Sequence, residues 1–198
     1  MQAQVAAPSG SADVKAASHP WAYSITVDGY AVPDGQSYVN PTVTADRGWL
    51  HLEGRYNYEN LRTGSLWVGY NWSAGKKWAL SVTPMIGGVF GRSTGVAPGA
   101  EASLTYKKIE VSIANEYLFD TSNSDGSFYY SWPQLTYSPL DWLRMGLVAQ
   151  HTKAYQTKLG IQRGVFVGFS HKKWEFTAYE FNAGWSDPTL VLELGASF

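Results

Sequence analysis

The sequence predicts an all-β chain that closes into an antiparallel up-and-down transmembrane β-barrel of about twelve strands, with short turns at one rim and modest loops at the other. Three observations carry this prediction. Apolar and polar residues alternate along most of the 198-residue chain, which is the period of a strand. Turn-forming residues cut the alternation into segments of about ten residues. Tryptophan recurs beside the shorter of these turns.

Composition narrows the classes of function. Charged residues make up 16% of the chain and the net charge is -1, so no basic field attracts nucleic acid. The absence of cysteine excludes disulfides and thiolate metal sites. No run reaches the roughly 18 apolar residues of a membrane helix. A mean hydropathy of -0.23 still fits a membrane barrel, because only every second strand residue faces lipid.

Residues 1–20 differ from the rest of the chain. They are rich in Ala, Ser, Pro and Gly and show no hydrophobic period, so we expect a flexible N-terminal tail, with a plug inserted into the barrel as the alternative. The opening MQAQVAAPSG has the character of a mature secreted N-terminus behind an added start Met. Residues 21–198 form the expected barrel.

The alternation assigns the strands in order. Near the end of the chain, for example, Leu190, Leu192 and Leu194 alternate with Glu193 and Gly195. The expected strands cover residues 22–32, 37–46, 49–59, 64–72, 78–90, 97–106, 109–119, 127–138, 142–152, 155–170, 174–185 and 189–198. Short connections at 46–48, 73–77, 107–108, 138–141 and 171–173 alternate with a second set that includes the longer polar stretches 91–96 and 120–126. Short turns on one side and longer loops on the other are typical of membrane barrels.

Aromatic residues mark the two expected rims. Five of the six odd-numbered strands are expected to begin with tryptophan, and Ile109 is the exception. Indole prefers the membrane interface, where its ring is apolar and its N–H meets water. A soluble barrel could start a strand with tryptophan once or twice, so five occurrences favour a membrane barrel. The expected girdle consists of Trp21, Trp49, Trp78, Trp142, Trp174 and the last residue, Phe198, and the opposite interface of Tyr117, Phe119 and Trp185.

If the apolar faces point to lipid, the opposite parity faces the lumen. Arg or Lys facing lipid near the midplane would cost about 2–4 kcal/mol each, so the shared parity of the charged residues supports this assignment. The expected pore-lining residues are Asp28, Glu53, Arg55, Glu101, Glu110, Glu116, Arg144, Lys158 and Glu193, with Glu175 beside them. Carboxylates outnumber basic groups in this set, which predicts a mild preference for cations.

The sequence is consistent with either an open or a closed lumen. In one, the charged residues line a water-filled path. In the other, Arg55, Arg144 and Lys158 pair with the carboxylates and close it. Eight-stranded barrels are filled by side chains and those of 16–18 strands are open, and twelve strands lie between. Small residues such as Gly69 and Gly87 leave space, whereas bulky ones such as Trp67, Met85, Phe128, Tyr130 and Trp132 remove it.

Catalytic and metal-binding patterns are weak. The four histidines show neither His-x-x-x-His nor His-Glu-x-x-His spacing. His51 points into the expected lumen beside Glu53 and could act as a base, but a hydrogen-bonded lumen residue is the favoured interpretation. We expect no catalytic residues, no metal site and no cofactor.

The residue pattern of the final strand is similar to that of a known class of proteins. Leu190 to Phe198, with apolar residues at every second position and a terminal Phe, resembles the C-terminal strand of bacterial outer-membrane β-barrel proteins. The resemblance implies a place in the bacterial outer membrane, contact with the lipid bilayer and lipopolysaccharide, recognition by the barrel-assembly machinery, and a monomer. The strand number is similar to that of small monomeric channels for oligosaccharides, nucleosides and sialic acid, and to that of the outer-membrane phospholipase.

These observations predict a channel of porin type that passes small solutes or ions passively, with a mild cation preference. Two other classes stay open. One is an accessory barrel with a closed lumen that holds another envelope protein. The other, less favoured, is a lipid-modifying enzyme, for which His51 would be the candidate base.

Overall fold

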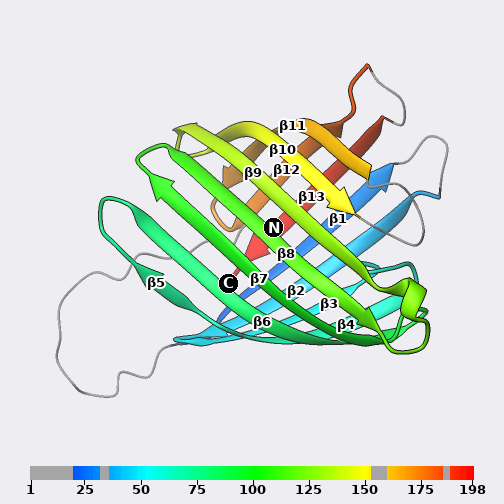
Figure 1. The fold of residues 1–198 in the computed structure, drawn as a ribbon. Coiled ribbons are helices and arrows are strands. Elements are labelled where there is room, and N and C mark those ends of the chain that lie inside the picture. The colour runs from blue at the N-terminus through cyan, green and yellow to red at the C-terminus, as the bar shows by residue number, and fades with distance from the viewer. Residues whose placement is uncertain (1–19, 32–35, 153–159, 185–187) are drawn as a thin grey trace, which may run out of the picture.

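The computed structural model describes residues 20–31, 36–152, 160–184 and 188–198, and these form one closed wall of strands (Figure 1). No helix in this part of the chain is long and apolar enough to span a membrane. The strands are β1 (Ala22–Ala31), β2 (Tyr38–Arg47), β3 (Leu50–Tyr56), β4 (Thr63–Tyr70), β5 (Trp72–Ala74), β6 (Ala79–Gly91), β7 (Gly95–Tyr106), β8 (Ile109–Asp120), β9 (Phe128–Leu140), β10 (Leu143–Thr152), β11 (Gly160–His171), β12 (Trp174–Phe181) and β13 (Thr189–Ser197), with one short helical turn, η1 (Ser124–Gly126).

The sheet closes on itself with antiparallel pairs throughout. Apart from β4 and β5, each strand pairs with its neighbours in sequence, β1 pairs with β13, and β4 pairs with β6. The segments β4 and β5 both pair with β6 and act as one strand interrupted at Asn71. The Asn71 side chain donates to Asp46 Oδ1 (2.6 Å) and accepts from Thr83 (2.8 Å), which holds the break in place. The barrel therefore has twelve strands, as the sequence predicts, and the β1–β13 and β4–β6 pairs close the wall.

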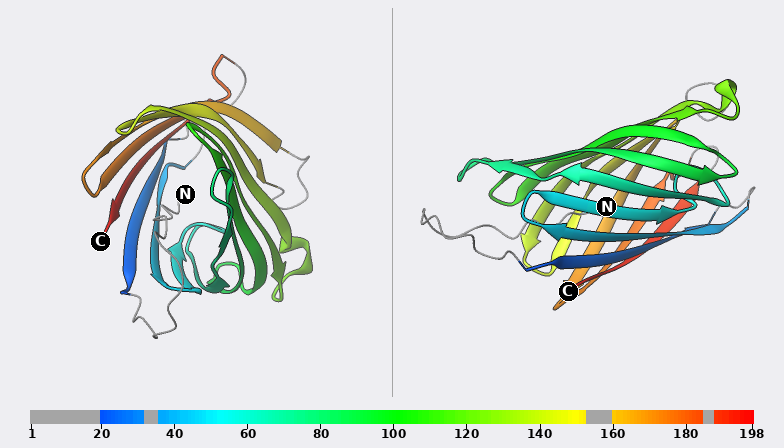
Figure 2. Two further views of the ribbon diagram at one scale, coloured as in Figure 1. Left: turned by 90° about the vertical axis from the view of Figure 1, so that its left-hand side faces the viewer. Right: turned by 90° about the horizontal axis from the view of Figure 1, so that it is seen from below.

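The two rims differ in how the chain turns. At one rim, which we call the turn rim, the pairs β2–β3, β7–β8, β9–β10 and β11–β12 are joined by only two residues each. Gly48, Lys107 and Lys172 adopt a positive φ there, as tight hairpin turns require. The left view of Figure 2 looks toward this rim, which also carries the C-terminus. The opposite, loop rim carries the longer connections, including η1.

The expected strand over 49–59 is too long, and the difference shapes the lumen. The strand ends at Tyr56, because Asn57 turns the chain with a φ of 59°. The Asn57 side chain donates to the Val39 carbonyl (2.9 Å) and accepts from the Arg62 N–H (2.7 Å). Residues 57–62 thus form a loop that carries Tyr58 inward against Tyr130. Asn residues adopt this conformation more readily than most others.

One further strand boundary differs from expectation. The expected strand over 174–185 ends at Phe181, where Asn182 turns the chain with a φ of 56°. The first residues of the expected strand over 155–170 lie outside the described residues, and its described part is β11, from Gly160 to His171. Residues 1–19, Lys158 and Trp185 lie outside the described residues. The N-terminal tail or plug, the pore-lining position of Lys158 and the interface position of Trp185 therefore stay predictions.

The wall separates an apolar exterior from a mixed interior. On β4, Leu66 and Val68 are exposed while Ser65 and Trp67 are buried, and on β13 Leu192 is exposed while Glu193 is buried. Burial inside a closed barrel means packing against the lumen, so exposed apolar residues face outward. A belt of exposed aliphatic and aromatic side chains on the outside is the surface that a lipid bilayer covers.

Candidate functional site

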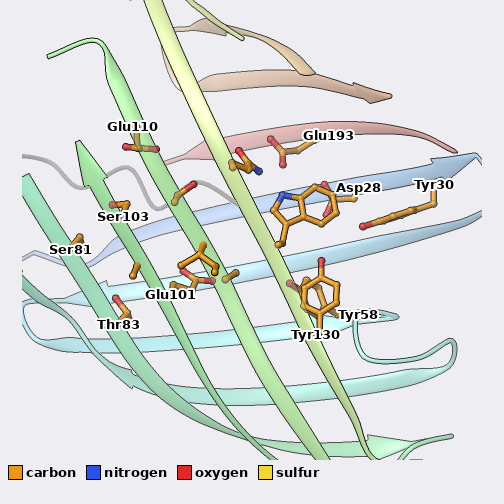
Figure 3. A pocket seen from close by; sticks show the side chains of 16 residues that line it. Asp28, Tyr30, Tyr58, Ser81, Thr83, Glu101, Ser103, Glu110, Tyr130 and Glu193 are labelled. Carbon is orange, nitrogen blue, oxygen red and sulfur yellow. The ribbon is translucent and has the colours of Figure 1, made fainter. Parts of the chain in front are cut away.

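The lumen has three zones along the barrel axis. At the turn rim, a vestibule of about 1070 Å3 is lined by strand and turn residues that include Lys76, Lys107 and Asp141. At mid-height, a narrower pocket of about 60 Å3 is lined by carboxylates and aromatic rings (Figure 3). Ser81, Ser103 and Glu110 line both spaces, so the vestibule tapers into the pocket. Toward the loop rim, side chains fill the interior.

The filled zone is a hydrophobic cluster built from the loop-rim halves of the strands. It contains Tyr30, Trp67, Met85, Val89, Ala97, Leu118, Phe128, Tyr130, Trp132, Val148, Phe166, Tyr179, Phe181 and Val191. Trp132 makes edge contacts with Tyr179 (5.5 Å between ring centroids) and Phe181 (5.2 Å), a geometry that aromatic pairs prefer. This packing separates the pocket from the loop rim in the described structure.

Arg55 bridges the lumen from β3 to β8. Its guanidinium donates to Glu53 through Nε (2.6 Å) and to Glu116 through a terminal nitrogen (2.7 Å), and a second terminal nitrogen lies 4.0 Å from Glu101. Strands β3 and β8 are not neighbours in the sheet, so the contact crosses the interior. A planar guanidinium with five donors suits such a site, because it can satisfy several carboxylates at once.

Two aromatic rings hold Arg55 in place. Its Cζ lies 4.3 Å from the Tyr58 ring centroid and 4.4 Å from that of Trp67, which is the range of cation–π attraction. The Arg55 side chain is 3% exposed. Tyr58 was not a candidate residue in the sequence, because the alternation placed it within a strand. The signal for its inward turn is Asn57, a residue that favours turns.

The small lumen residues near Trp67 do not leave open space, contrary to the expectation for Gly87. A Cβ on Gly87 would lie 2.4 Å from the Trp67 ring, and one on Gly99 would lie 3.1 Å from it. The Trp67 indole therefore packs directly against the backbone of these two glycines. The Trp67 Nε1 donates to Ser65 (3.0 Å), and Ser65 donates to Glu59 (2.5 Å). Glycine and tryptophan here are complementary shapes in one packed layer.

A second ion cluster centres on Arg144 of β10. Its guanidinium forms ion pairs with Glu175 and with Glu193 (3.1 Å), and it donates to Thr177 (2.5 Å). Glu193 also accepts from Thr177 (3.1 Å) and Tyr179 (3.2 Å). Along its own strand, Glu193 has no basic residue two positions away, so its basic partner comes from another part of the wall. The fold brings Arg144 from a strand three positions away around the wall.

Asp28 and Glu110 are the remaining expected pore-lining residues that the structure describes. Asp28 lies directly across from Glu193 in the β1–β13 register and lines the mid-height pocket. Glu110 accepts from Thr105 (2.9 Å) and lies where the vestibule meets the pocket. The structure thus brings Asp28, Glu101, Glu110 and Glu193 to one pocket, and it places Glu53, Arg55 and Glu116 in the cluster beside it.

His51 has both ring nitrogens against carboxylates. Its Nδ1 lies 2.8 Å from Asp46 and its Nε2 lies 3.2 Å from Glu53. A catalytic base needs one nitrogen directed at a nucleophile or at a substrate proton. With both nitrogens engaged, His51 extends the Arg55 cluster toward the turn rim. In the described chain, no group of three or more His, Cys, Asp or Glu side chains could hold a metal ion.

The aromatic residues of the expected girdle gather at the turn rim. Trp174 begins β12, while the other four tryptophans each stand one residue before a strand. Trp49 stacks on Tyr70 (5.8 Å between centroids), and Trp142 on Phe169 (6.2 Å). Trp21, Trp49, Trp78, Trp142, Trp174 and Phe198 are all exposed. Near the loop rim, Tyr117 and Phe119 are exposed and contact each other (4.6 Å).

Comparison with solved structures assigns the fold. No protein-family model and no curated protein sequence matches the chain. A structure described as KdgM porin superposes with a TM-score of 0.62 at 14% identity, covering 88% of this chain and 99% of that one. KdgM porin in complex with disordered oligogalacturonate gives 0.59 at 13% identity, covering 88% and 98%. The chain therefore shares the β-barrel fold of the KdgM porin, with a closed wall, an apolar exterior and aromatic residues at both rims.

Proposed function

We propose that the barrel is a channel for small solutes or ions, that it prefers cations, and that it opens by moving the loop of residues 57–62. The observation that carries this proposal is the polar funnel, a vestibule of about 1070 Å3 that tapers into an acidic pocket at mid-height. A barrel that served only as a structural anchor would gain nothing from a solvent-filled interior lined by charge. The turn rim faces the periplasm in barrels of this class, so the funnel opens there.

Charge supports the cation preference. The pocket and the two ion clusters contain seven carboxylates, namely Asp28, Glu53, Glu101, Glu110, Glu116, Glu175 and Glu193, against the two guanidinium groups of Arg55 and Arg144. Carboxylates in a confined pore attract cations and repel anions. Lys76, Lys107 and Lys108 surround the vestibule at the periplasmic rim, where the opening is wide and salt screens them well.

The same charge argues against one solute. The KdgM structure was solved with oligogalacturonate, which is a chain of negatively charged sugars. A low-dielectric wall focuses the field of buried carboxylates, so such a polyanion would be repelled from the pocket of this barrel. Neutral or cationic solutes small enough for the pocket suit it better.

A solute can pass the hydrophobic cluster only if part of the lumen moves. Tyr58 packs against Tyr130 and covers Arg55, and it belongs to a loop rather than to the wall. Glu59 and Asn60 tie that loop to Ser65 and Ser93 (2.5 and 3.0 Å). Hydrogen bonds of this kind contribute about 0.5–1.5 kcal/mol each, which permits opening on the timescale of loop motions.

A barrel with a closed lumen is the second candidate. The observation that favours it is the fourteen-residue hydrophobic cluster together with the Arg55 bridge. Such a barrel would act as a membrane anchor or as a partner of another envelope protein. The lipid-modifying enzyme is less favoured, since both nitrogens of His51 are engaged by carboxylates.

Planar bilayer recording separates these functions. Purified protein should give small, discrete conductance steps, and a tenfold KCl gradient should give a reversal potential of the sign expected for cation preference. The preference should weaken as salt shortens the Debye length from about 30 Å at 0.01 M to about 3 Å at 1 M. Folded protein without steps would favour the closed barrel. An anion-selective sign would overturn the cation preference, and turnover of phospholipid or lipopolysaccharide would favour the enzyme.

A further inference from the structure

Asp28 is a carboxylate in the wall of the mid-height pocket. Among the described residues it makes no ion pair and no hydrogen bond, although it lines the mid-height pocket. Its cross-strand partner is Glu193, and residues directly opposite in an antiparallel pair have Cβ atoms about 4.5–5.5 Å apart. Figure 3 shows the two carboxylates reaching the same part of the pocket from β1 and β13. Like charges at this spacing destabilise a sheet unless a cation lies between them.

The pocket also contains two polar atoms without partners. Gln134 is 4% exposed and its Oε1 has no hydrogen bond, and Trp132 is 9% exposed and its Nε1 has none. Both residues line this pocket. A buried polar atom without a partner costs about 1–3 kcal/mol. One free acceptor and one free donor facing the same space indicate a ligand that both donates and accepts hydrogen bonds.

The walls favour an organic cation over a metal ion. Tyr30, Tyr130 and Trp132 line the pocket beside the carboxylates. Aromatic faces attract weakly hydrated ammonium groups. In the described chain, the carboxylates do not come together in a group of three or more that could hold a metal ion. The pocket of about 60 Å3 exceeds the roughly 10–15 Å3 that one water requires several times over. A ligand of a few heavy atoms fits.

We propose that this pocket binds a small hydroxylated primary amine in its ammonium form. The ammonium donates to Asp28, Glu193 and Gln134 Oε1, while the hydroxyl accepts from Trp132 Nε1. The site deepens the proposed function by naming the class of solute that the channel takes, and it rests on that function for its biological role. Binding itself can be measured without conduction, because the vestibule connects the pocket to solvent.

Equilibrium dialysis of radiolabelled ethanolamine against the full chain in dodecyl maltoside micelles tests the site. We expect saturable binding that Asp28→Asn weakens about tenfold or more, the loss expected for a charged hydrogen bond of about 1.5–3 kcal/mol. Asp125→Asn is the matched control, since it makes the same change on an exposed loop, and it should bind as the wild type does. Heat-modifiable migration on gels should confirm that both variants are folded.

Competitors define the ligand class. Unlabelled ethanolamine should displace the label best, ethylammonium less well, and ethylene glycol, glycolate and Na+ poorly. Trp132→Phe removes the indole N–H and keeps an aromatic face, so it should abolish the preference for ethanolamine over ethylammonium. Equal binding by Asp28→Asn, no saturable binding, or displacement by Na+ as strong as by ethylammonium would overturn the site.

The two proposals fail in distinguishable ways. Cation-selective conductance steps without ethanolamine binding would leave the channel standing and remove the site. Ethanolamine binding that depends on Asp28, in a barrel that gives no steps, would support the site and remove the channel.

Discussion

At the scale of single residues, the lumen is defined by how completely each carboxylate is compensated. Glu53 and Glu116 share the buried guanidinium of Arg55. Glu193 has Arg144 together with two hydroxyl donors. Glu101 lies 4.0 Å from Arg55, and its side chain is 18% exposed. Compensation of the carboxylates therefore decreases from the two clusters toward Glu101 in the pocket.

This gradient separates two selectivity variants. Glu101→Gln should lower the cation preference and leave stability nearly unchanged, because its one ion pair is long. Glu193→Gln should also lower the preference, but it should cost about 1–3 kcal/mol, because Arg144, Thr177 and Tyr179 lose a charged partner. Reversal potentials and urea unfolding measure the two effects. Equal loss of stability in both variants would contradict the difference in compensation.

At the scale of strands and loops, the sequence could predict the wall but not what fills it. Alternation along β4 and β13 follows from the period of a strand, so the outward positions of Leu66 and Leu192 could be inferred. The pairing of Arg144 with Glu193 depends on which strands meet around the barrel, and spacing along one strand contains no such information. The inward turn of Tyr58 depends on one Asn conformation, which alternation cannot detect.

The fit between β4 and β6 gives a test with a close control. Gly87→Ala places a methyl group 2.4 Å from the Trp67 ring, so the indole must shift against Arg55. Overpacking of this kind costs about 1–3 kcal/mol. Gly88→Ala adds the same methyl where nothing lies within 4 Å and should be nearly neutral. Urea unfolding followed by tryptophan fluorescence measures both, and equal effects would show that Trp67 is not packed on Gly87.

The loop of residues 57–62 gives a test of opening. Tyr58→Ala removes the ring that packs on Tyr130 and covers Arg55, so we expect larger or longer conductance steps with the same selectivity sign. Tyr56→Ala is the control, because Tyr56 is exposed on the outer face. Unchanged steps in Tyr58→Ala would show that the loop does not limit conduction.

At the scale of the whole molecule, the interior of the barrel differs between the turn rim and the loop rim. The apolar belt and the aromatic rims are features of the class, and their pattern in the sequence was sufficient to predict them. The interior is not symmetric in the same way. Its turn-rim half is a polar vestibule, and its loop-rim half is a hydrophobic cluster. A solute therefore meets open, charged space from one side and packed side chains from the other.

This asymmetry predicts where a water-soluble reagent enters. The chain has no cysteine, so single replacements report one position each. Ser103 lines both the vestibule and the pocket, and Ser103→Cys should react with a bulky membrane-impermeant maleimide only after the outer membrane is permeabilised. Ser122→Cys, on an exposed loop at the opposite rim, should react in intact cells. Leu66→Cys faces lipid at 66% exposure and should react in neither state, because maleimides need a thiolate in water. Labelling of Ser103→Cys in intact cells at the rate of Ser122→Cys would mean that the hydrophobic cluster does not seal the outer half of the lumen.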